Sequence, residues 1–200
     1  MNSINILIDY LSQKYTSLEN TIGGKENIKR YTKPSMASYT ENAIALLIDN
    51  IKKSKLNYLI DSQLSVCKSK IIRPDIIIYD KNNVIIGIAE IKSQLGYAGN
   101  FNVKDYKNKI KILKEASNKG ILSISKINMN FSISDKCKFF IVVLMSSNSH
   151  DNLKKLKGTN YFVLFEKEKG KKLWYDNLSA KYINKKEHGY NQFVDFVKKI

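Results

Sequence analysis

Apolar residues recur every three or four positions in four stretches of the chain, which is the spacing of amphipathic helices. The predicted helices cover residues 5–18, 38–51 and 103–119, with a fourth at the C-terminal end of the sequence. The third helix directs Val103, Tyr106, Ile110 and Leu113 toward a sheet. The fourth is marked by the apolar stripe Tyr190, Phe193, Val194, Val197 and Ile200.

The segments between these helices have the period of two, or the continuous apolar runs, that indicate strands. Residues 56–66 alternate as one strand, residues 75–80 and 84–92 form a hairpin, and the apolar runs at 139–145 and 161–165 predict buried strands. Residues 173–175 are a candidate edge strand, and residues 21–34 and 93–100 are predicted loops. This order predicts one α/β domain over residues 1–200, with a three-layer mixed central β-sheet flanked by helices.

The hairpin brings acidic side chains together if Asn82 and Asn83 form a two-residue turn, because Asn tolerates the positive φ that tight hairpin turns need. Residues whose numbers sum to 165 then lie opposite one another. This register pairs Asp75 with Glu90, Ile77 with Ile88, and Tyr79 with Ile86.

The expected carboxylate pair needs a nearby cation. Two carboxylates with Cβ atoms roughly 5 Å apart repel one another and weaken the strand pairing. Mg²⁺ is usually held by one or two carboxylates together with water and phosphate oxygens, so it fits Asp75 and Glu90. Lys92 continues the same face. The alternative is an ordinary hairpin in which Glu90 and Lys92 form a solvent-exposed pair of little energetic value.

The motif Pro74-Asp75, followed by Glu90-Ile91-Lys92, resembles the PD-(D/E)XK nuclease superfamily, which includes many type II restriction endonucleases. The resemblance implies that Asp75 and Glu90 bind Mg²⁺ and that the backbone carbonyl of Ile91 also coordinates it. It implies that Lys92 positions or deprotonates the attacking water. It also implies a restriction endonuclease-like fold.

Glu41, near the start of the second predicted helix, has two interpretations. The superfamily resemblance often places an additional acid there, reaching toward the metal. Ser38 and Glu41 also have the spacing of a capping box, which involves no catalysis. The sequence alone favours neither interpretation.

The formal net charge of +16 on 200 residues favours a polyanionic partner such as DNA, because binding releases the counterions of the phosphates. The third helix carries a basic stripe of Lys104, Lys107, Lys111 and Lys114 along its polar face. The predicted loop before it offers further DNA-contacting side chains at Gln94, Tyr97, Asn100 and Asn102. An acidic membrane surface is the competing partner.

The longest apolar run, residues 139–145, is far shorter than the roughly 20 residues that span a bilayer. We therefore expect no membrane insertion and a cytoplasmic protein. Cys67 and Cys137 are the only cysteines, so neither a disulfide framework nor a zinc site is expected.

Together these features predict a Mg²⁺-dependent endodeoxyribonuclease that hydrolyses double-stranded DNA, of the type II restriction kind. Cutting both strands of a palindrome would call for a homodimer. The alternatives are a DNA repair, recombination or junction-resolving nuclease with the same site, a catalytically inactive DNA-binding module of the same fold, or a nuclease acting on RNA.

Overall fold

The computed structural model describes residues 36–53, 56–66, 70–95, 103–117, 122–124, 129–146, 158–167, 183–185 and 187–200. The helix expected at 5–18, the loop expected at 21–34 and the strand expected at 173–175 lie outside these residues.

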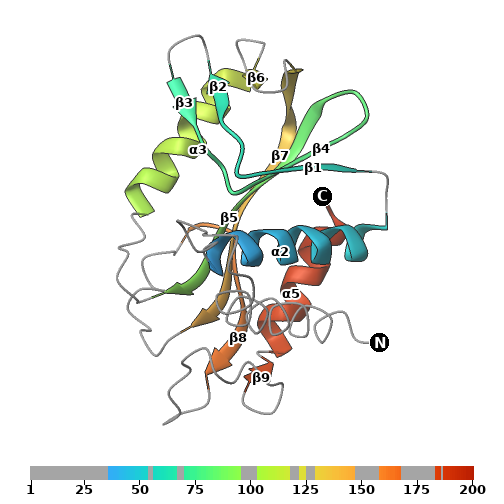
Figure 1. The fold of residues 1–200 in the computed structure, drawn as a ribbon, viewed down its shortest axis with the longest axis vertical. Helices are drawn as coiled ribbons and strands as arrows, with labels where there is room; N and C mark the ends of the chain where they lie inside the picture. Colours follow the sequence, from blue (N-terminus) through green and yellow to red (C-terminus); the bar gives the residue numbers. More distant parts are fainter. Residues whose placement is uncertain are drawn as a thin grey trace, which may run out of the picture.

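The described helices and strands follow one another in the order shown in Figure 1. They are α2 (Met36–Lys52), β1 (Asn57–Ile60), β2 (Leu64–Val66), β3 (Lys70–Ile72), β4 (Ile76–Tyr79), β5 (Val84–Leu95), α3 (Val103–Ser117), β6 (Leu122–Ile124), β7 (Met129–Ser146), β8 (Tyr161–Lys167), β9 (Ile183–Lys185) and α5 (Glu187–Lys198).

The described strands form one mixed sheet around the two long strands β5 and β7. The main order of its strands is β1-β4-β5-β7-β6-β2-β3. Outside this order, β8 pairs with both β7 and β9. The β1–β4 and β4–β5 pairs are antiparallel, whereas β5–β7 and β7–β8 are parallel. The prediction of an α/β fold with a mixed sheet is therefore confirmed.

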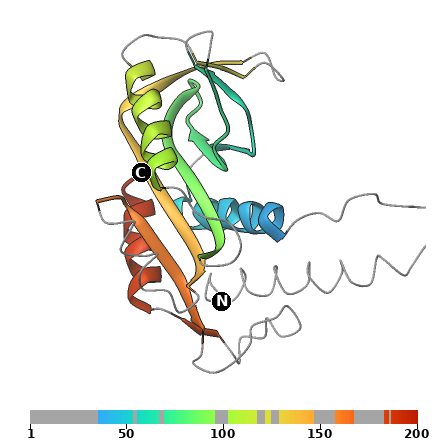
Figure 2. The same cartoon turned by 90° about the vertical axis from the view of Figure 1, so that its left-hand side faces the viewer.

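Helices cover both faces of this sheet, and alternate strand residues face two different cores. One core joins α2 and α5 to Ile76 and Ile78 of β4. The other joins α3 to Ile77 on the opposite face of the same strand. Ile76, Ile77 and Ile78 are all fully buried, so the hairpin is covered on both sides. Along the long strands, α3 lies beside the upper part of the sheet and α5 beside the lower part (Figures 1 and 2).

Three predicted segments differ from the structure. The strand expected at 139–145 is longer, because β7 runs from Met129 to Ser146. Residues 56–66 were expected to form one strand, but β1 pairs with β4 while β2 pairs with β3 and β6. The chain changes direction at Asp61, which has a φ of 52°. Residues 93–95 were expected to begin a loop but belong to β5, which continues to Leu95, and residues 96–100 lie outside the described residues.

The hairpin has the predicted register but a different turn. Ile76 pairs with Ala89, Ile77 with Ile88, and Ile78 with Gly87, as expected. Tyr79, however, pairs with Ile85 instead of Ile86. Of the turn residues 81–83, only Asn83 has positive φ, at 60°. The Asp80 carboxylate accepts hydrogen bonds from the backbone N–H groups of Asn82 and Val84.

A three-residue loop with its last residue in the left-handed region introduces a bulge. The register shift between Ile78 and Tyr79 is the irregularity next to this turn. Beyond it, the pairing returns to the register that aligns Asp75 with Glu90.

Candidate functional site

The candidate site (Glu41, Asp75, Glu90 and Lys92) lies where β4 begins and where β5 continues past the end of its antiparallel partner. Asp75 directly precedes β4, and its Oδ2 accepts a hydrogen bond from the backbone N–H of Ile91 at 2.6 Å. Its side chain is 18% exposed and that of Glu90 is 12% exposed. The structure therefore brings the two predicted acids to one place at the border of the sheet.

Lys92 lies between the two acids. Its Nζ is 3.1 Å from Oε1 of Glu90 and 3.9 Å from Oδ2 of Asp75. The alternative of a solvent-exposed Glu90–Lys92 pair does not describe this geometry, because the Glu90 carboxylate is nearly buried and a second acid shares the lysine.

Lys109 of α3 is a member of this cluster that the sequence reasoning missed. Its Nζ is 3.4 Å from both carboxylate oxygens of Glu90. The signal was present in the sequence, since Lys109 lies three residues after Tyr106 and four before Leu113, both of which are buried. A lysine beside the apolar stripe lies close to the sheet that the helix covers, where an acid such as Glu90 can pair with it.

The environment of Asp75 disfavours its charged form. Burial raises the pKa of Asp75, and the nearby Glu90 carboxylate raises it further. The Ile91 N–H, Lys92 and Lys109 act in the opposite direction. The net upward direction means that burial and the Glu90 charge together outweigh the hydrogen bond from Ile91 and the two lysines.

Glu41 faces the same site from α2. Burial, followed by the charges of Asp75 and Asp61, raises the pKa of Glu41 to about 7. The capping-box interpretation of this residue is wrong, because α2 begins at Met36 and Ser38 is already within its first turn. The location beside Asp75 is the one expected of an auxiliary acid.

The oxygen atoms at this site are suitable ligands for a hard divalent cation. The N–H and C=O of one strand residue point to the same side of the strand, so the Ile91 carbonyl points to the side where its N–H meets Asp75. This carbonyl and the two carboxylates are the donor type that Mg²⁺ prefers. Within the described ranges, no three His, Cys, Asp or Glu side chains are arranged closely enough to hold a metal by themselves.

The predicted basic stripe of α3 is exposed. Lys104, Lys107, Lys111 and Lys114 all have solvent-exposed side chains, and Tyr106 and Leu113 of the same helix are buried. Lys111 lies 3.9 Å from Glu115 in a surface pair. The stripe therefore presents its positive charge outward, as predicted.

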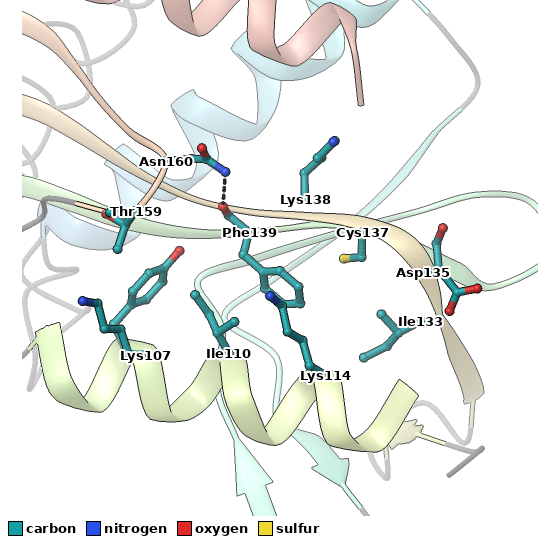
Figure 3. Close-up of a pocket in the computed structure, with 13 residues that line it drawn as sticks. Lys107, Ile110, Lys114, Ile133, Asp135, Cys137, Lys138, Phe139, Thr159 and Asn160 are labelled. Atoms are coloured by element: carbon teal, nitrogen blue, oxygen red, sulfur yellow. Dashed lines mark hydrogen bonds between the residues drawn. The ribbon is translucent and has the colours of Figure 1, made fainter. Parts of the chain in front are cut away.

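A groove of about 770 Å³ runs between α3 and residues 133–139 in the middle of β7 (Figure 3). Lys107 and Lys114 lie on its α3 side, and the turn before β8 contributes Asn160, whose amide donates a hydrogen bond to the Phe139 carbonyl at 3.2 Å. Lys114 lies 6.0 Å from the centre of the Phe139 ring. Figure 3 shows Phe139 pointing toward α3 and Lys138 pointing to the other side of β7. The groove thus has lysines on its α3 border, with the Phe139 ring beside Lys114.

The remaining predicted DNA-contacting residues are only partly described. Gln94 lies in β5, where it pairs with Met145, so it does not belong to a loop as predicted. Tyr97, Asn100 and Asn102 lie outside the described residues. Cys137 lies in β7 as a free cysteine, and Cys67 is outside the described residues.

No protein-family model, curated protein or solved structure matches this chain. The fold and the site therefore define it only as a mixed α/β protein with acids and lysines gathered at the end of a β-hairpin. None of the described helices combines the length and apolar character needed to cross a membrane.

Proposed function

We propose that this protein is a Mg²⁺-dependent endonuclease that hydrolyses phosphodiester bonds in double-stranded DNA, of the restriction type within the PD-(D/E)XK superfamily. The observation that carries the proposal is the position of Lys92, whose ammonium group lies between the carboxylates of Asp75 and Glu90. The mixed sheet with helices on both faces agrees with what the superfamily resemblance implies.

Asp75, Glu90 and the Ile91 carbonyl would hold Mg²⁺. When bound, this ion stabilises charge on the phosphate and lowers the pKa of its water. The hydrogen bond from the Ile91 N–H holds Asp75 Oδ2 in position, and Lys109 balances the charge of Glu90 from the α3 side.

Lys92 and Glu41 have complementary tasks in this proposal. The Lys92 ammonium donates hydrogen bonds, so it orients the attacking water and favours hydroxide. The pKa of Glu41 is raised to about 7 in the metal-free protein. Its carboxyl group faces the same site as Asp75 and is the proposed acceptor of the proton of that water. This assigns the positioning of the water to Lys92 and its deprotonation to Glu41.

The DNA would lie against α3. The stripe of Lys104, Lys107, Lys111 and Lys114 is on the helix that also sends Lys109 to Glu90, so the basic surface and the site share one element. A duplex that follows the stripe would have its backbone neutralised while a phosphate approaches the acids.

One observation favours a second candidate, a DNA-binding module without chemistry. Both Glu90 oxygens are 3.4 Å from Lys109, which places a protein cation against one of the proposed metal ligands. In an active enzyme, Lys109 would either move away from Glu90 when Mg²⁺ binds or stay in contact with a Glu90 carboxylate that also binds the ion.

Supercoiled plasmid incubated with Mg²⁺ tests the proposal. The wild type should nick and linearise it, whereas Lys92→Ala and Asp75→Asn should lower the rate by at least about 100-fold. Asp195→Asn and Lys199→Ala are matched controls, since both residues are exposed in or just after α5 and lie outside the candidate site and the basic stripe of α3. Full activity in Lys92→Ala would contradict the site assignment.

The products separate the alternatives. Discrete fragments support a restriction enzyme, and a smear supports a nonspecific or repair nuclease. DNA binding by the wild type without any Mg²⁺-dependent nicking would support the second candidate. Parallel incubations with duplex DNA, single strands and RNA identify the substrate.

A further inference from the structure

Arg73 stands out in a chain that uses lysine for almost every basic position. Only two of its 34 basic residues are arginine, and Arg73 is the one in the described part of the chain. It directly precedes Pro74 and Asp75, and its side chain is 58% exposed. Arginine differs from lysine in its planar guanidinium, which can donate two parallel hydrogen bonds to one phosphate.

Asp61 holds the Arg73 guanidinium beside the candidate site. Nη2 of Arg73 donates a hydrogen bond to Oδ2 of Asp61. The backbone N–H of Asp61 in turn donates to the Asp75 carbonyl at 2.9 Å, so the partner of Arg73 is tied to the residue that carries the first acid. Asp61 has a φ of 52°, a conformation that Asp and Asn tolerate better than most residues.

The positive charge of Arg73 interacts with the acids of the candidate site. Arg73 and Lys92 lower the pKa of Glu41, opposing the increase caused by burial and by the charges of Asp75 and Asp61. Asp75 also interacts electrostatically with the Arg73 guanidinium. Because Arg73 lies two residues before Asp75 and its partner Asp61 is hydrogen-bonded to the Asp75 backbone, one DNA phosphate can contact the guanidinium while a neighbouring phosphate approaches the acids.

We propose that Arg73 binds a backbone phosphate of the substrate beside the candidate site, and that Asp61 is its resting partner in the free protein. This inference rests on the proposed function for the identity of the substrate. The Arg73–Asp61 pair is largely solvent-exposed, and such pairs contribute little to stability. A phosphate can therefore replace the Asp61 carboxylate, or share the guanidinium with it, at small cost.

Binding of a fluorescently labelled duplex in EDTA, followed by anisotropy, tests the proposal without any cleavage. Arg73→Ala should weaken binding by roughly tenfold, the value of one charge-assisted hydrogen bond. It should also reduce the slope of log affinity against log salt by about 0.9. Arg73→Lys should keep the slope and still lose affinity, because the lysine cannot form the two parallel bonds.

Asp61→Asn distinguishes a phosphate site from a structural ion pair. Asparagine keeps the shape of the side chain and the tolerance for positive φ, but it removes the competing charge. A phosphate site predicts tighter binding in this variant, opposite to Arg73→Ala. A purely structural pair predicts that both variants weaken binding and lower the thermal midpoint together.

Equal effects of Arg73→Ala and Asp61→Asn would overturn the inference, and so would unchanged binding in Arg73→Ala. Lys199→Ala is the control for loss of one exposed positive charge just after α5. If plasmid cleavage fails while opposite effects persist in EDTA, the nuclease proposal is wrong and the phosphate site stands. If cleavage depends on Lys92 but Arg73→Ala binds normally, only the Arg73 inference fails.

Discussion

Replacing Glu41 with glutamine should stabilise the protein above neutral pH and leave its stability almost unchanged in acid. The pKa of Glu41 rises from 4.5 to about 7, first because the side chain is partly buried and then because Asp75 and Asp61 repel its charge. The folded state therefore binds this proton more tightly than the unfolded state. The resulting penalty is absent below pH 4.5, grows between pH 4.5 and 7, and is complete above 7.

The size of the effect follows from this shift. For a fully shielded group it would be worth about 3 kcal/mol at high pH. Glu41 is only half-buried, so solvent screening reduces this to roughly 1–2 kcal/mol. For a chain of this length, that corresponds to an increase of about 3–6 °C in the thermal midpoint.

Urea and thermal unfolding of wild type and Glu41→Gln at a series of pH values measure the difference directly. Glu115→Gln is the matched control, because Glu115 is an exposed acid that pairs with Lys111 on the surface of α3. A gain from Glu41→Gln that is the same at low and high pH would show that packing, not ionisation, is responsible. A loss of stability above neutral pH would refute the proposed electrostatic environment.

The other predictions concern the metal, the basic surface and the packing of α5. Added Mg²⁺ should raise the thermal midpoint of the wild type in a saturable manner and have little effect on Asp75→Asn, as differential scanning fluorimetry would detect. Lys107→Ala and Lys114→Ala should each weaken duplex binding and lower its salt slope by about 0.9, measured by anisotropy at several salt concentrations. Gly189→Ala should cost at least about 2 kcal/mol in urea unfolding, because a Cβ there would overlap with the Val163 carbonyl oxygen.

The hairpin shows how far turn chemistry and strand pattern can predict local geometry. The pairing of Ile77 with Ile88 followed from an assumed two-residue turn at Asn82 and Asn83, and the structure has this pairing. The turn was predicted incorrectly, since Asn83 alone adopts positive φ and Asp80 caps the loop. A bulge between Ile78 and Tyr79 compensates for the different turn. The pairing of Ile76, Ile77 and Ile78 was therefore predicted correctly although the turn was not.

Long-range features were less accessible to sequence reasoning. The break between β1 and β2 depends on Asp61, whose left-handed conformation is linked to a hydrogen bond with Asp75 far along the chain. No local pattern encodes that contact. Lys109 could have been found from its position beside a buried stripe, whereas the association of Glu41 with Asp75 required the packing of α2 against the sheet.

The parallel pairing of β5 with β7 has a consequence for how the chain folds. Partners in this pair, such as Ile88 and Phe139, are separated by about 50 residues, whereas the β4–β5 hairpin closes over a short loop. Distant pairings carry a larger entropy cost before any contact compensates it. We therefore expect Asp75 and Glu90 to meet early in folding and Lys109 to reach Glu90 only when the central strands associate in the slow step.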